Sequence, residues 1–363
     1  MSAPTTMRPW LHTVVFLLSL LGTAQLFAVF GRSGNYGPSG FFTQDGTLIP
    51  LAEIANFLTG GGMYEAASNE HPRGQCMPGL RVRQSYDRPR WDYFDAQGCI
   101  LIQHNDLGFR DVEFPIAKPP GEFRVLAIGD SLTYGSGVLR EDAWPEVLER
   151  HIAASGRPTQ VINCGFAGGH APAQYANWLD SDGLLLDPDL VVIGLSLNDL
   201  GNGNDVPMLC YQGVTSVGCP IALIDQFATV YVNWRATANP VDYVQVVRSH
   251  PETWTATQAG LKRMQARLQE RSIPYVVAIL PMFSGLENEP NPYAGLHRLA
   301  SEFCREAGIP YVDLLDTVAG RRSEDLWVHP TDQHPIPEGH RLLAAGLYRY
   351  LVAQGLVAKA KSD

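Results

Sequence analysis

Five short apolar segments alternate with longer segments of helical periodicity, and this alternation limits most strongly what the chain can fold into. The apolar segments are 124–128, 159–163, 189–195, 274–280 and 310–314, and the helical ones are 142–154, 172–179, 253–269, 291–307 and 337–351. Strands that are apolar throughout are typical of a parallel sheet covered on both faces. We therefore predict an α/β fold, a three-layer α/β/α sandwich around a five-stranded, mainly parallel sheet.

The rest of the chain divides around this domain. Residues 31–120 have no long helical periodicity and are rich in glycine, proline, asparagine and aromatic residues, which indicates an irregular, β-containing lead-in segment. Residues 121–363 hold the main domain. Residues 200–250 are too long for an ordinary connection in such a domain, and we interpret them as an insertion that borders the functional site.

Residues 1–30 form a basic and then apolar N-terminus, with Arg8 as their one charged residue. The small residues Gly22 and Ala24 after the apolar run resemble a signal-peptide cleavage site. Residues 11–30 also have the ~20 residues needed to span a bilayer. A cleaved signal peptide and an N-terminal membrane anchor both remain open. Either one predicts an extracytoplasmic protein, periplasmic or secreted, released or tethered to the membrane through residues 11–30.

The charge balance excludes one class of partner. The chain has 27 basic and 37 acidic residues and a net charge of -10. Such a surface repels phosphate backbones, so we expect no nucleic-acid partner.

Six cysteines in an exported chain permit disulfides. We predict two bridges, because Cys210 and Cys219 enclose a short glycine-containing loop and Cys76 and Cys99 bracket a polar stretch. Cys164 follows an apolar strand and Cys304 lies in a helical pattern, so we predict that both are buried thiols.

Four polar blocks carry the chemistry. They are IGDSLTYG at 128–135, NCGFAG at 163–168, LND at 197–199 and DQHP at 332–335. Three of them follow predicted strands, and the ligand site of a parallel sheet lies at the carboxyl ends of its strands. A serine on such a turn exposes its hydroxyl, a neutral histidine can take its proton, and a carboxylate can orient that histidine.

These four blocks, in this order, resemble the GDSL/SGNH family of ester hydrolases and acyltransferases over residues 124 to 351. The resemblance implies a flavodoxin-like sandwich with Ser131 as the nucleophile, His334 as the general base and Asp332 as its orienting partner. It also implies an oxyanion hole formed by the backbone N–H groups of Ser131 and Gly168 and the side-chain amide of Asn198.

The sequence departs from the family pattern at two places. Ser196 stands where the third block usually has glycine, and Asp332 precedes His334 by two residues where the family usually has three. A second acid–histidine pair, Asp325 and His329, is an alternative dyad; we favour His334 because the following segment leads directly into the last helix. We expect Asp130, His170 and Ser196 to line the cleft.

The resulting prediction is an exported serine ester hydrolase that forms an acyl-enzyme. Export and the lack of a recognisable lipase-like lid favour removal of a small acyl group, such as acetyl, from a carbohydrate or another polar ester. A polysaccharide O-acetyltransferase and a non-catalytic glycan-binding or assembly protein are the alternatives. The sequence has no metal-ligand spacing, and this mechanism needs no cofactor. A nucleotide-binding protein is disfavoured, because the first block lacks the G-x-G-x-x-G loop.

Overall fold

The computed structural model describes residues 40–43, 47–49, 72, 74–86, 92–166, 170–201, 227, 242–329 and 332–359. The predicted signal or anchor (1–30), Gly168 and the Cys210–Cys219 pair lie outside these residues. Within them, no helix is both long and apolar enough to cross a bilayer.

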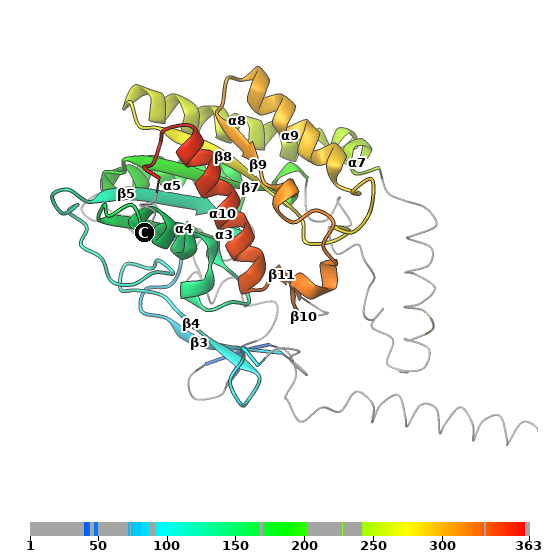
Figure 1. The fold of residues 1–363 in the computed structure, drawn as a ribbon, viewed down its shortest axis with the longest axis horizontal. Helices are drawn as coiled ribbons and strands as arrows, with labels where there is room; N and C mark the ends of the chain where they lie inside the picture. Colours follow the sequence, from blue (N-terminus) through cyan, green and yellow to red (C-terminus); the bar gives the residue numbers. More distant parts are fainter. Residues whose placement is uncertain are drawn as a thin grey trace, which may run out of the picture.

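Five parallel strands form the central sheet, in the order β6-β5-β7-β8-β9 (Figure 1). They are β5 (Phe123–Gly129), β6 (Thr159–Gly165), β7 (Leu190–Ser196), β8 (Tyr275–Leu280) and β9 (Tyr311–Asp313). Each coincides with a predicted apolar segment to within a residue or two. The predicted parallel sheet is therefore confirmed.

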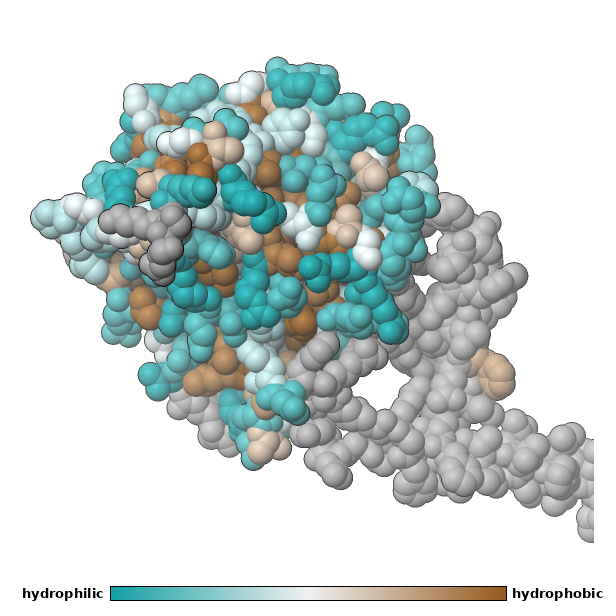
Figure 2. Space-filling model, viewed as in Figure 1, coloured by the Kyte–Doolittle hydropathy of each residue, from teal (hydrophilic) through white to brown (hydrophobic). Residues whose placement is uncertain are grey.

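Two sets of helices cover the two faces of this sheet, which confirms the three-layer sandwich. They are α4 (Trp144–Ala153), α5 (Pro172–Ser181), α8 (Pro251–Glu270), α9 (Ala294–Glu306) and α10 (Pro337–Ala353). Alternate residues of β5 show the division: Leu126 and Ile128 pack with α5, α8 and α9, whereas Val125 and Ala127 pack with α4 and α10. On the side drawn in Figure 2, hydrophilic residues cover most of the outer surface, and apolar residues form smaller patches between them.

The lead-in segment forms a separate antiparallel sheet in the order β2-β1-β3-β4, as its β-containing character predicts. The strands are β1 (Gly40–Phe42), β2 (Leu48–Ile49), β3 (Arg81–Ser85) and β4 (Cys99–Gln103). Val82 and Gln84 of β3, and Tyr86 just after it, are buried at every second position. They face inward because side chains two residues apart in a strand point to the same side.

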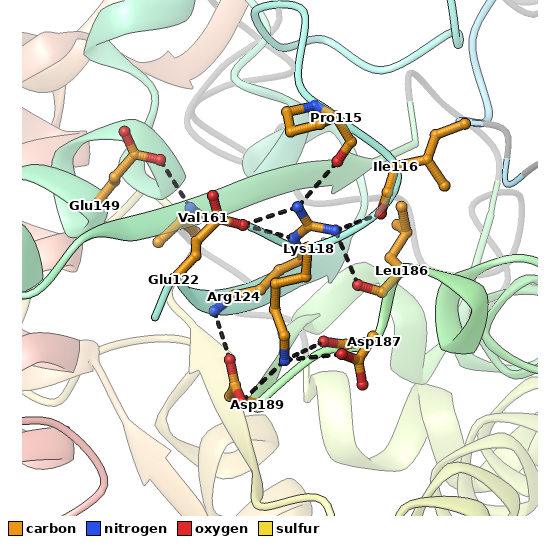
Figure 3. A network of polar contacts seen from close by, with 10 residues as sticks. All are labelled: Pro115, Ile116, Lys118, Glu122, Arg124, Glu149, Val161, Leu186, Asp187 and Asp189. Carbon is orange, nitrogen blue, oxygen red and sulfur yellow. Dashed lines mark hydrogen bonds and ion pairs between the residues drawn. The ribbon is translucent and has the colours of Figure 1, made fainter. Parts of the chain in front are cut away.

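A buried arginine fixes the chain where the lead-in joins the central sheet (Figure 3). The Arg124 guanidinium, fully buried, donates hydrogen bonds to three backbone carbonyls and pairs with a neighbouring carboxylate; its partners are Pro115, Ile116, Leu186 and Glu122. Lys118 joins Asp187 and Asp189, and Asp189 in turn accepts the backbone N–H of Arg124. This network lies at the amino end of β5, away from the carboxyl edge where a functional site is expected.

The predicted Cys76–Cys99 bridge is wrong, because both residues are thiols in the structure. Cys99 begins β4 opposite Ser85, whereas Cys76 bonds through its backbone N–H to Gly108, beyond the other end of β4. A five-residue strand spans about 13 Å at ~3.3 Å per residue, and a disulfide needs Cα atoms within ~7 Å. The predicted thiols Cys164 and Cys304 are confirmed, and both are buried.

Candidate active site

A sharp strand-to-helix turn carries Ser131. It is the first residue of the one-turn helix α3 (Ser131–Tyr134), directly after β5. Asp130 caps this helix, and its Oδ1 accepts the backbone N–H of Leu132 at 3.0 Å. Gly135 ends the helix in the left-handed region, at φ 83°, where a side chain would be strained.

Two glycines let α3 lie directly on the ends of the central strands. A Cβ on Gly129 would lie 2.1 Å from Thr133 Oγ1, and one on Gly165 would lie 2.2 Å from the backbone nitrogen of Tyr134. Any larger residue at these strand ends would push the helix away. The short GDSL and NCG blocks therefore fix the height of Ser131 above the sheet.

A hairpin of two strands, β10 (Trp327–His329) and β11 (Asp332–Pro335), carries the histidine block. The sequence did not predict this hairpin. It directs the His334 ring toward α3: Nε2 lies 2.8 Å from Ser131 Oγ, and Nδ1 lies 2.6 Å from Asp332 Oδ1. Ser131, His334 and Asp332 are therefore hydrogen-bonded in series.

The alternative dyad is not directed at Ser131. His329 is paired across it with Asp332, is buried, and packs its ring 5.4 Å from that of Tyr86. Asp325 lies in the short helix η6 (Ser323–Leu326). The structure thus brings His334, rather than His329, to the serine.

The electrostatics of the pair follow from its geometry. Burial raises the pKa of the Asp332 carboxyl, but the charge and hydrogen bonds of His334, together with the Tyr86 hydroxyl, lower this pKa to about 2. Burial lowers the pKa of His334, whereas the charge and hydrogen bond of Asp332 outweigh it and raise the pKa above its usual value. About 31% of the His334 side chain is exposed to solvent, so a substrate can reach the imidazole ring.

Ser196, the departure from the family glycine, has a clear partner. Its side chain is fully buried and donates from Oγ to Asp130 Oδ1 at 2.7 Å. Asn198, in the short helix η4 (Leu197–Leu200), donates from Nδ2 to Asp130 Oδ2 at 3.1 Å. Asp130 therefore joins the ends of β5 and β7, and Asn198 retains a second amide hydrogen for another acceptor. Ser196 lies beneath the site and does not line its opening.

Of the remaining predicted residues, only His170 is described. Its ring lies 4.7 Å from that of Phe166, and its backbone carbonyl accepts the Tyr175 hydroxyl at 3.1 Å. It therefore packs beside the end of β6. No three His, Cys, Asp or Glu side chains are grouped to hold a metal ion among the residues that the structure describes.

The sequence missed three lead-in residues that contact the segments carrying the site. The Tyr86 hydroxyl donates to Asp332 Oδ2 at 2.7 Å, and His104 Nε2 is hydrogen-bonded to the Tyr134 hydroxyl at 2.7 Å. The Arg110 guanidinium donates to the carbonyls of Tyr134, Gly135 and Val138. No local pattern marks these residues, because their partners are distant in the sequence.

The parallel sheet with a serine turn and a histidine–carboxylate pair at its carboxyl edge is typical of an enzyme that hydrolyses esters. The comparison with protein families agrees: the model of the GDSL-like Lipase/Acylhydrolase family matches residues 127–342, more than half of the chain. The chain belongs to this family and is an ester-hydrolysing enzyme. The lead-in segment lies outside the matched residues.

Solved structures resemble the chain at low identity. The lipase/acylhydrolase from Enterococcus faecalis is 20% identical, with a TM-score of 0.40, over 66% of this chain and 100% of the other. An alpha/beta hydrolase from the metagenome of Lake Arreo is 18% identical, with a TM-score of 0.42, over 64% of this chain and 95% of the other. A mutant acetyl-xylooligosaccharide esterase from Geobacillus Stearmophilus is 17% identical, with a TM-score of 0.41, over 62% of this chain and 93% of the other. Comparison with curated proteins gives no significant match.

Proposed function

We propose that the enzyme is an exported serine esterase in which Ser131 is the nucleophile, His334 the general base and Asp332 the residue that orients it. The observation that carries the proposal is the hydrogen-bonded series from Ser131 Oγ through His334 to Asp332, at 2.8 and 2.6 Å. Asp332 accepts the Nδ1 proton of His334, which leaves Nε2 free of hydrogen and able to accept the proton of the serine hydroxyl.

The reaction proceeds in two steps. Ser131 Oγ attacks the ester carbonyl carbon while its proton moves to His334 Nε2. The C–O bond to the alcohol then breaks, and the alcohol leaves with that proton. Water gives a proton to Nε2, attacks the acyl-enzyme and releases the acid, and the same proton returns to Ser131 Oγ.

We assign the oxyanion to three donors. The backbone N–H of Ser131 stands at the first position of α3, where no carbonyl of the helix can accept it. The second amide hydrogen of Asn198 lies on the same edge of the sheet. Gly168, outside the described residues, is the third donor in this proposal. Three fixed donors favour the charge that develops on the carbonyl oxygen in the transition state.

We propose a small acyl group, such as acetyl, on a carbohydrate or another polar ester. This part rests on the apolar N-terminus, which favours export to a compartment where polar esters are accessible, and on the lack of a recognisable lipase-like lid in the sequence. A polysaccharide O-acetyltransferase would form the same acyl-enzyme and pass the acyl group to a sugar hydroxyl. Product analysis with a sugar acceptor separates the two, and the N-terminal residue of the mature protein tests export by cleavage.

Turnover of p-nitrophenyl acetate by matched variants tests the mechanism. Ser131→Ala should lower kcat by on the order of 10³-fold or more, and His334→Ala should do the same. Ser181→Ala, at the end of α5, is the control and should retain activity. His329→Ala should lower kcat much less than His334→Ala, because His329 packs on Tyr86 and does not contact Ser131. A fluorophosphonate should label Ser131 in the wild type. Wild-type turnover by Ser131→Ala would contradict the proposed nucleophile.

A further inference from the structure

Tyr86 of the lead-in segment reaches the carboxylate of the proposed triad. Its hydroxyl lies 2.7 Å from Asp332 Oδ2, and 246 positions separate the two residues in the sequence. His334 takes the other oxygen, Oδ1, at 2.6 Å through its ring nitrogen. Each carboxylate oxygen therefore has its own side-chain donor, and the plane of the carboxylate is fixed at two points.

The hydrogen-bond pattern gives the direction of the Tyr86 proton. Gln84 Nε2, two residues earlier on the same face, lies 2.6 Å from the Tyr86 hydroxyl oxygen and donates to it. A phenol has a single hydrogen, and a carboxylate can only accept. The Tyr86 hydrogen must therefore point at Asp332, while the hydroxyl oxygen accepts from Gln84.

The Tyr86 ring is held in place by its packing. It is 3% exposed and lies 5.2 Å from the ring of Phe94 and 5.4 Å from that of His329. A Cβ on Gly137 would approach the hydroxyl oxygen to 3.1 Å and Val328 to 2.7 Å, so only glycine leaves this space to the phenol. A hydroxyl fixed in this way has no rotational freedom to lose when the reaction begins.

We infer that Tyr86 is a positioning residue of the triad: its hydroxyl holds Asp332 Oδ2 so that Oδ1 stays on His334. This inference rests on the proposed function of Ser131, His334 and Asp332. Tyr86 comes from a segment outside the residues that match the family, so the lead-in segment completes the catalytic unit of this chain.

The charges around this unit determine its pH behaviour. Around His334 the titratable groups are Asp332 on β11, Asp130 before α3 and His340 on α10, and around Tyr86 they are Arg110 of the lead-in and His329 on β10. Burial and the Asp332 charge raise the pKa of Tyr86 well above its usual value, so the phenol stays protonated. Burial lowers the pKa of His340 to about 3, so it stays neutral.

Removal of the Tyr86 hydroxyl should change the pKa of His334 in a defined direction. The hydroxyl draws electron density from Asp332 and helps to lower its pKa. Without it, the full negative charge of Asp332 acts on His334 and raises the histidine pKa further. Because the base must be neutral, the rise of activity with pH then moves to higher pH.

The test compares Tyr86→Phe with Tyr93→Phe in the full chain. Tyr93 is a matched control, because it also comes from the lead-in, donates to a carboxylate of the main domain (Asp142, 2.7 Å) and accepts a backbone N–H. For p-nitrophenyl acetate we expect Tyr86→Phe to lower kcat about 10-fold. We also expect it to move the rising limb of the kcat–pH profile to higher pH. The KM of Tyr86→Phe should be unchanged. Tyr93→Phe should retain the wild-type kcat and the wild-type position of the rising limb.

Gln84→Met provides a second variant. It should lower kcat and move the rising limb of the kcat–pH profile to higher pH, as Tyr86→Phe does. The kcat of the double variant should be no lower than that of Tyr86→Phe, because Gln84 acts through the Tyr86 hydroxyl. Equal kcat and an unmoved limb in Tyr86→Phe and Tyr93→Phe would overturn the inference. Ser131→Ala in the same assay separates the inference on Tyr86 from the proposed function. If Ser131→Ala is inactive, an unchanged Tyr86→Phe overturns only the inference on Tyr86. If Ser131→Ala is active, the proposed function itself is contradicted.

Discussion

Arg110 offers the sharpest test of how the lead-in segment supports the main domain. Its side chain is 1% exposed, and its guanidinium donates to the carbonyls of Tyr134, Gly135 and Val138. It also lies 4.6 Å from the centre of the Tyr134 ring. These carbonyls belong to the end of α3 and the turn after it, so Arg110 satisfies groups that a one-turn helix leaves without partners.

The magnitude follows from these contacts. Arg110→Met keeps the length of the side chain but removes the charged donor from three carbonyls. Two of them keep only a long hydrogen bond, from Asn163 Nδ2 to Tyr134 at 3.4 Å and from the Val138 N–H to Gly135 at 3.3 Å. Hydrogen bonds to a charged donor contribute ~1.5–3 kcal/mol each. Part of that sum is offset because the guanidinium no longer has to be desolvated. A buried acceptor that loses its donor costs ~1–3 kcal/mol, so we expect a net loss of about 3–5 kcal/mol for the three carbonyls together. The loss of unfolding free energy in Arg110→Lys should lie between wild type and Arg110→Met, because an ammonium keeps the charge but lacks the planar fork of the guanidinium.

Equilibrium urea unfolding measures this change. With a slope of about 3 kcal/mol per molar urea, Arg110→Met should lower the unfolding midpoint by roughly 1–1.7 M. The control is Arg83→Met on β3 of the lead-in sheet; Arg83 is partly exposed and pairs with Asp95 at 2.8 Å. Such an exposed pair is worth at most ~1 kcal/mol. A midpoint for Arg110→Met within about 0.3 M of wild type would refute the reasoning, because α3 would then hold its carbonyls without Arg110.

Two further predictions concern the site and the cysteines. Asp332→Asn removes the charge that raises the pKa of His334, so the rising limb of the kcat/KM profile should move to lower pH, while kcat falls ~10²-fold or more; a limb at the wild-type pH would contradict this origin of the shift. Alkylation in denaturant without reductant, read by intact mass, should find at least four reactive thiols, and three or fewer would contradict the thiol state of Cys76, Cys99, Cys164 and Cys304.

The choice of histidine shows the limit of the sequence argument. The histidine block alone left His329 and His334 both open, and context favoured the second. The hairpin of β10 and β11 decides it, because its pairing turns His334 toward α3 and leaves His329 packed on Tyr86. A three-residue strand with a register shift has no periodicity long enough to predict.

The cysteine prediction failed for a related reason. Cys76 and Cys99 lie close in the sequence, which made a bridge attractive. The ladder of β3 and β4 places them at opposite ends of a strand, and no composition argument gives that register. In an antiparallel pair the register depends on the turn and on which face is buried.

The sequence by itself determined the parallel sheet, its covering helices and the edge at which the serine turn lies. Apolar periodicity is local, and the carboxyl ends of parallel strands meet at one edge whatever the loops do. Only the tertiary structure decided which histidine meets Ser131, why Ser196 is tolerated and that Tyr86 bonds to Asp332. Those contacts join residues up to 246 positions apart, and their geometry depends on how the lead-in sheet packs on the main domain, which no local pattern encodes.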